Sequence, residues 1–148
     1  MRALIQRVSS ASVSTREGNT NSIDQGFCIL LGVGPDDTEE IAKKLWSKIS
    51  KLRIFEDQNG KTNLSLSDVS GAVLLVSQFT LYADCRKGNR PSFTKGASPD
   101  LANRLYEYFA QLIRDDDVEL KTGWFGARME VSPVSYTHLR AHETTLHL

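Results

Sequence analysis

The stretch that decides the fold is Ala72-Val73-Leu74-Leu75-Val76-Ser77-Gln78-Phe79-Thr80-Leu81. Its first half is an unbroken apolar run rich in valine and leucine, which predicts a strand buried on both faces. The run then turns polar, and polar side chains at the end of a buried strand cost free energy unless they have partners or a task. On an extended strand, Gln78 and Thr80 point to one face, and Ser77 and Phe79 to the other. We therefore predict a site at the end of this strand.

A basic loop follows the strand, between residues 83 and 97. It carries four cations within ten residues and no acidic residue among them: Arg86, Lys87, Arg90 and Lys95. Contacts of such side chains with phosphates give affinity without sequence readout. A solvated loop explains the same residues equally well. A polar strand end beside a basic loop suits an anionic, polar substrate.

The composition indicates one domain without a strong charge bias. The chain has 148 residues, and 18 Lys and Arg balance 18 Asp and Glu, so any nucleic-acid partner must be inferred from local clusters of charge. We expect no signal peptide and no membrane span, because polar residues interrupt the apolar runs. Cys28 and Cys85 form no Cys-x-x-Cys pair and are expected to be reduced thiols of a cytoplasmic protein.

The remaining pattern predicts an α+β fold with a mainly antiparallel sheet. Two helices are expected, the first beginning at residues 36–38 and the second at Ser98-Pro99-Asp100, where Ser98 can cap the helix. Asn59-Gly60 is typical of a hairpin turn. Strands are expected at residues 2–8, 11–15, 20–23, 26–33, 53–55, 63–66, 118–122 and 129–131.

Several motifs resemble those of the D-aminoacyl-tRNA deacylases. They are Ser77-Gln78-Phe79-Thr80-Leu81, Arg90-Pro91-Ser92-Phe93-Thr94-Lys95-Gly96-Ala97-Ser98-Pro99, and the opening Met1 to Val8 with Ala11-Ser12-Val13. The resemblance implies a curved, barrel-like β core with two helices, assembled as a homodimer with its sites at the subunit interface. It implies hydrolysis of the ester of D-aminoacyl-tRNA, and of mischarged glycyl-tRNA, to free amino acid and tRNA. The partner is then aminoacyl-tRNA and not DNA or a membrane, and neither a cofactor nor a metal is expected.

The resemblance implies roles for single residues. Thr80, Gln78, Phe79 and Ser77 would form the catalytic strand end, and backbone N–H groups near Phe79 and Thr80 could form an oxyanion hole. No histidine occurs before residue 138, so no Ser-His or Cys-His system is available before the tail. Thr80 is then either the nucleophile or an ordinary strand residue. In the second case the reaction is substrate-assisted, because the ribose 2′-hydroxyl helps to activate water. We favour the substrate-assisted reaction.

Two residues outside this strand are also assigned by the resemblance. Arg7 matches a residue that braces a Gly-Pro loop in the family, and Met129 matches a position that lines the pocket. Without the resemblance, Arg7 is equally well a surface charge on an edge strand, and a lone methionine is more often part of the core. The four cations of the basic loop are the candidate tRNA-binding residues.

The tail does not continue the resemblance, which ends near Ser132. Residues 1–132 are therefore expected to form a deacylase-like domain that lacks its last strand. Residues 133–148 resemble a translated sequencing adapter, and we expect a non-native tail that is an artefact of the sequence. His138, His142 and Glu143 give half of a metal site without a clear third ligand, so no metal is predicted.

The tail also lacks a feature that the family carries. The family's Gly-Pro dipeptide, which rejects L-amino acids through its carbonyls in the partner's site, has no counterpart after residue 35. Two alternatives to an active deacylase follow. One is a non-catalytic tRNA-binding or editing accessory domain, and the other is an inactive, truncated member of the family.

Overall fold

The computed structural model describes residues 1–135 and 143–147. The strands are β1 (Arg2–Val8), β2 (Ser10–Thr15), β3 (Thr20–Ile23), β4 (Gly26–Gly32), β5 (Phe55–Glu56), β6 (Thr62–Leu64), β7 (Ala72–Ser77), β8 (Leu120–Thr122), β9 (Met129–Val134) and β10 (Glu143–His147). The helices are α1 (Glu39–Ser50) and α2 (Pro99–Asp115), with one 3-10 turn, η1 (Phe79–Tyr82). The predicted α+β class is confirmed.

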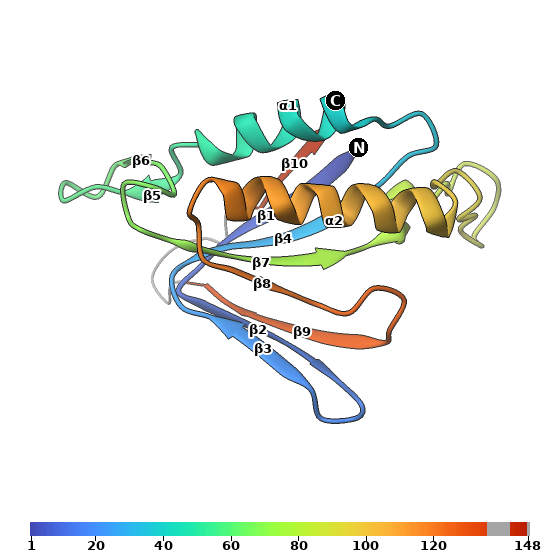
Figure 1. Cartoon of the computed structure of the whole chain (residues 1–148), viewed down its shortest axis with the longest axis horizontal. Helices are drawn as coiled ribbons and strands as arrows, with labels where there is room; N and C mark the ends of the chain where they lie inside the picture. The colour runs from blue at the N-terminus through green and yellow to red at the C-terminus, as the bar shows by residue number, and fades with distance from the viewer. Residues whose placement is uncertain (136–142, 148) are drawn as a thin grey trace.

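The described strands form three separate sheets. One has five strands in the order β10-β1-β4-β7-β8, one has three in the order β3-β2-β9, and β5 pairs with β6. The two helices lie on one side of the five-stranded sheet and the three-stranded sheet lies on the other (Figure 1). The described strands do not close into a barrel, and the curved, barrel-like core that the resemblance implies stays a prediction.

The centre of the large sheet is parallel, which the sequence analysis did not predict. β1 is antiparallel to β4, but β7 is parallel to both β4 and β8. The reason lies in the connections, because α1 lies between β4 and β7 and α2 lies between β7 and β8. A connection that contains a helix carries the chain back to the end of the sheet where the previous strand began. The next strand therefore runs parallel to it. Parallel strands bring the ends of β4 and β7 to one edge of the sheet.

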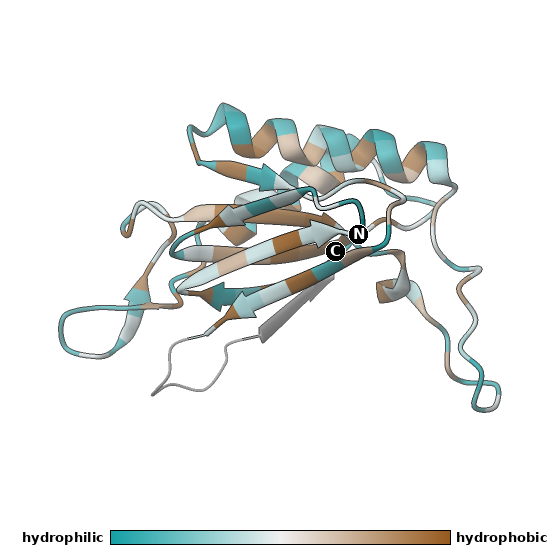
Figure 2. Cartoon of the chain, turned by 90° about the horizontal axis from the view of Figure 1, so that it is seen from below, coloured by the Kyte–Doolittle hydropathy of each residue, from teal (hydrophilic) through white to brown (hydrophobic). Residues whose placement is uncertain are grey.

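Strand β7 contributes to two hydrophobic clusters, one on each face. Val73 and Leu75 pack with the helices in the larger cluster, while Leu74 and Val76 pack with residues of the three-stranded sheet in the smaller one. All four side chains are almost completely buried. Figure 2 shows the hydrophobic residues along the strands and mainly hydrophilic residues in the projecting loops. The prediction of a strand buried on both faces is confirmed.

Both helices begin at the predicted caps. Thr38 Oγ1 accepts a hydrogen bond from the Ile41 amide at 3.3 Å, and Ser98 Oγ accepts one from the Leu101 amide at 3.4 Å. The indole nitrogen of Trp46 in α1 donates to the Asp116 carboxylate after α2 at 2.7 Å. This bond joins the helices that cover the sheet. No helix in the described ranges is long and apolar enough to cross a membrane.

The C-terminal segment contributes to both main sheets. β9 extends to Val134, and β10 pairs antiparallel with β1 at the edge of the large sheet, with Gln6 opposite Glu143. His138 and His142 lie outside the described residues. Within residues 1–135 and 143–147, no group of three potential metal ligands occurs. That residues 133–148 are non-native stays a prediction.

Candidate functional site

Strand β7 ends one residue after its apolar run. The amide of Gln78 still donates to the Leu31 carbonyl oxygen of β4 at 2.8 Å, and the chain then turns into η1, where the Ala83 amide donates to the Thr80 carbonyl oxygen at 3.0 Å. The expectation that residues 77 to 80 alternate between two faces of a strand is therefore wrong. The turn instead directs consecutive residues toward the same edge of the sheet.

A cavity of about 530 Å³ lies at this edge. Three of the four predicted catalytic residues line it, namely Ser77, Gln78 and Phe79, together with the predicted pocket residue Met129. Its other walls come from β7, the end of β4, the basic loop, the start of α2 and the β8–β9 connection: Leu31, Val33, Val76, Phe93, Gly96, Ala97, Pro99, Ala102, Phe125, Gly126, Ala127 and Arg128. The lining is largely apolar, as is typical of pockets that bind small molecules.

Thr80 lies beside the cavity without lining it. Its hydroxyl oxygen accepts a hydrogen bond from the side-chain amide of Gln78. No carboxylate and no histidine is among the described residues that line the cavity, and Arg128 is the charged side chain there. Thr80 therefore has no neighbouring base in the cavity that could remove its proton.

Two adjacent backbone donors beside the cavity lack a hydrogen-bond partner among the described residues. They are the amides of Phe79 and Thr80, at the start of η1. Phe79 also lines the cavity. Adjacent free N–H groups at a pocket are the kind of donors that stabilise an oxyanion during ester hydrolysis.

Met129 is held in place at the wall of the cavity. Its sulfur accepts a hydrogen bond from the Trp124 amide at 3.2 Å. A Cβ at Gly123 would lie 2.6 Å from the same sulfur, so a side chain at position 123 would displace it. The absence of a side chain at Gly123 lets the β8–β9 connection approach Met129.

Arg7 lies away from the cavity. It is 2 % exposed, and its guanidinium donates to the Ile54 carbonyl oxygen at 2.8 Å. In the sheet it stands opposite Phe27 near the start of β4, whereas the cavity adjoins the end of that strand at Leu31. Within one chain the structure does not bring Arg7 to the other predicted site residues.

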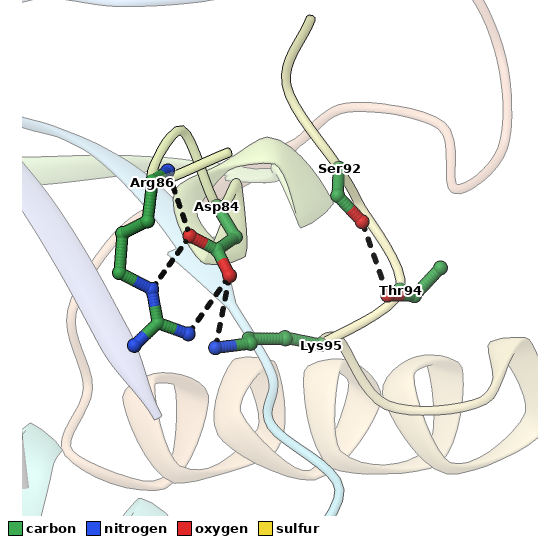
Figure 3. Close-up of polar contacts among 5 residues, drawn as sticks. All are labelled: Asp84, Arg86, Ser92, Thr94 and Lys95. Atoms are coloured by element: carbon green, nitrogen blue, oxygen red, sulfur yellow. Dashed lines mark hydrogen bonds and ion pairs between the residues drawn. The ribbon is translucent and has the colours of Figure 1, made fainter. Parts of the chain in front are cut away.

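The basic loop contains an internal acid that the sequence analysis did not consider. Asp84 Oδ1 accepts from Arg86 Nε at 2.9 Å, and its Oδ2 lies 3.0 Å from Lys95 Nζ (Figure 3). Hydrogen bonds from Arg86, and then from Lys95, hold the pKa of Asp84 well below its usual range. Two of the four predicted tRNA-binding cations are thus already paired. Lys87 and Arg90 are exposed and form no ion pair with any described residue.

The sequence analysis missed much of the cavity wall. Phe79, Phe93 and Phe125 are exposed to 62 %, 44 % and 37 %, and the rings of Phe79 and Phe93 meet edge to face at 5.5 Å. Three exposed aromatic rings at one cavity are unusual on a protein surface and favour a ligand. The available signal was Gly123-Trp124-Phe125-Gly126, in which aromatic residues occupy a glycine-bounded turn.

The fold and cavity define an α+β protein with a largely apolar pocket and two unpaired amides. A family model described as D-Tyr-tRNA(Tyr) deacylase matches residues 4–136. The chain belongs to this family.

Relatives cover most of the chain. A D-aminoacyl-tRNA deacylase of Thermosipho africanus is 52 % identical over 135 residues, which are 91 % of each chain. One of Bacillus pumilus is 54 % identical over 132 residues, 89 % of this chain and 90 % of that one. Among solved structures, a c-Myc DNA unwinding element binding protein matches with a TM-score of 0.89 and 34 % identity, covering 100 % of this chain and 99 % of the other. A probable eukaryotic D-amino acid tRNA deacylase matches in fold, with a TM-score of 0.81 and 16 % identity over 98 % of each chain.

Proposed function

We propose that this protein hydrolyses the ester bond of D-aminoacyl-tRNA and releases free D-amino acid and tRNA, as a proofreading step in translation. Family membership and relatives more than 50 % identical support this function. The same site would remove glycine from mischarged tRNA, because glycine has no side chain of the wrong hand to exclude.

The observation that carries the proposal is the pair of unpaired amides at Phe79 and Thr80 beside the cavity. Attack on an ester carbonyl places negative charge on its oxygen, and fixed N–H donors stabilise that charge more in the transition state than in the ground state. An ester whose acyl group occupies the cavity would direct its carbonyl oxygen to these amides.

Water activation is assigned to the substrate. The described cavity lining offers no carboxylate or imidazole as a base, and the Thr80 oxygen is held as an acceptor by Gln78. The ribose 2′-hydroxyl next to the ester can position and polarise the attacking water instead. Gln78 and Ser77 would then orient the ester, and Thr80 would support Gln78.

The proposal includes a homodimer in the cytoplasm with sites at the subunit interface. Arg7, which matches the family residue that braces the Gly-Pro segment, would lie near that interface, away from the cavity of its own chain. The family's Gly-Pro segment has no counterpart after residue 35, so we expect weak discrimination between D- and L-esters. Lys87 and Arg90 are the proposed tRNA contacts of the basic loop, while Arg86 and Lys95 must leave Asp84 before they can take part.

A second candidate function is nucleic-acid binding without turnover. It is favoured by the match to the solved structure of a c-Myc DNA unwinding element binding protein. Such a protein would use the cavity only as a binding pocket. It would bind its nucleic-acid ligand in a fixed ratio and would not hydrolyse it.

Deacylation of D-tyrosyl-tRNA and L-tyrosyl-tRNA tests the proposal. We would compare this chain with a variant whose residues after Ser132 are replaced by a tail that carries Gly-Pro. The repaired protein should release only D-tyrosine, and the present chain should release both or neither. If neither protein turns over the D-ester, while both bind tRNA stoichiometrically, the binding function replaces the enzyme.

A further inference from the structure

A second cavity adjoins the first at the β2–β9 edge. It measures about 410 Å³ and is lined by Ser14, Thr15, Arg16, Arg128, Met129 and Glu130. Arg128 and Met129 also line the first cavity, so the two cavities share part of their walls. We call the second cavity the arginine groove.

Two arginines line the groove at facing positions just past the end of the β2–β9 ladder. The last pair of the β2–β9 ladder is Thr15 opposite Met129. The next residue past the pair is Arg16 after β2 and Arg128 before β9. Both are exposed, and neither forms an ion pair with a described residue. Like charges at facing positions of neighbouring strands destabilise the pair, so a bound anion would relieve a repulsion.

The acidic residue of the groove does not neutralise this pair. Glu130 lines the groove and stands opposite Ser14, one ladder step from Thr15, but it forms no ion pair with any described cation. Two cations against one carboxylate leave an excess positive charge beside the first cavity. A guanidinium can give two parallel hydrogen bonds to a phosphate, which fixes its orientation.

We propose that the arginine groove binds a phosphate of the single-stranded 3′ end of tRNA while the aminoacyl group occupies the first cavity. This inference rests on the proposed function. Arg128 then contacts the substrate at the junction, and Arg16 supplies the second charge. The groove would hold this phosphate at a fixed distance from the ester in the first cavity. Esters of a polynucleotide should therefore bind more tightly than free amino acid esters, which have no such phosphate.

The test compares three substrates that differ in phosphates: D-tyrosyl-adenosine with none, D-tyrosyl-CpA with one, and D-tyrosyl-tRNA. Arg128→Gln should raise KM about tenfold more for the two phosphate-bearing substrates than for D-tyrosyl-adenosine, which carries no phosphate. With Arg16→Gln added, the slope of log KM against log salt for tRNA should fall by about 0.7 for each lost contact. The charge-matched control Lys61→Gln, in the β5–β6 turn, should change nothing.

The outcomes distinguish this inference from the proposed function. If D-tyrosyl-adenosine is turned over, and Arg128→Gln either changes KM equally for all three substrates or changes it for none, phosphate binding in the groove is refuted. The proposed deacylase activity then still stands. If no substrate is turned over, the proposed deacylase activity is refuted. Binding of uncharged CpCpA, measured by fluorescence, would still test the groove. An unchanged Kd for CpCpA in the Arg16→Gln, Arg128→Gln double variant would then overturn it.

Discussion

Gly26 is a position where a single methyl group should disrupt the central sheet. It stands at the start of β4, opposite Ala72 in the parallel ladder with β7. A Cβ at Gly26 would lie 1.8 Å from the Ala72 carbonyl oxygen and 2.7 Å from its carbonyl carbon. These are backbone atoms of a paired strand, and the neighbouring Ala72 amide donates to the Gln25 carbonyl oxygen at 2.9 Å. The methyl group can be accommodated only if the strands separate there.

We therefore expect Gly26→Ala to lower the free energy of unfolding by about 3 kcal/mol, at the upper end for an overpacked core. For a domain of this size, that loss corresponds to a melting temperature about 6–12 °C lower. Thermal and urea unfolding followed by circular dichroism would measure both. Gly18→Ala is the matched control, because a Cβ there meets nothing within 4 Å and only the φ of +92° opposes it. That control should cost about 1 kcal/mol. Equal losses in the two variants would refute the clash.

Four further results are expected. Thr80→Ala should keep deacylation within about tenfold of the parent, as a supporting hydrogen bond would; a loss of several orders of magnitude would make Thr80 the nucleophile. Asp84→Asn should release Arg86 and Lys95, and steepen the salt dependence of tRNA binding by about 0.7–0.9 in slope for each new phosphate contact; an unchanged slope would contradict this. Tyr106→Phe should cost only about 1 kcal/mol, because the Leu75 carbonyl oxygen, which accepts from the Tyr106 hydroxyl at 2.8 Å, still accepts from the Gly123 amide at 3.0 Å; a loss above about 3 kcal/mol would show that the remaining bond does not compensate. Burial raises the pKa of Cys28 to about 11, so iodoacetamide at pH 8 should label the native protein once, at exposed Cys85. The unfolded chain loses the Cys28 proton first as the pH rises from about 9 toward 11, so stability should fall across that window; double labelling or a flat profile would show that Cys28 is accessible.

Local signals in the sequence predicted the elements that depend on neighbouring residues. Thr38 and Ser98 cap their helices because a side-chain oxygen needs only an amide three residues later. The hairpin at Asn59-Gly60 follows in the same way, with Gly60 at a φ of +73°. Burial of β7 on both faces followed from its unbroken apolar run.

Features that depend on distant segments could not be predicted in this way. β7 is parallel to its neighbours because helices occupy both connections, and the turn after Ser77 follows a bond from the Gln78 amide to Leu31 in another strand. Asp84 reaches Lys95 because the loop folds back on itself, with the Asp84 and Ser92 backbones paired at 2.8 and 2.9 Å. No pattern in the loop alone gives that closure.

β7, which belongs to both hydrophobic clusters, also determines how the molecule opens. Because Val73 and Leu75 anchor one layer and Leu74 and Val76 the other, neither layer can detach without exposing the same strand. Its amides should exchange with deuterium only through global unfolding, more slowly than those of the peripheral hairpins. The strand that delivers Ser77 to the cavity should therefore open only with the whole core. The basic loop and the β8–β9 connection, which contribute the exposed Phe93 and Phe125 to the cavity wall, should exchange sooner.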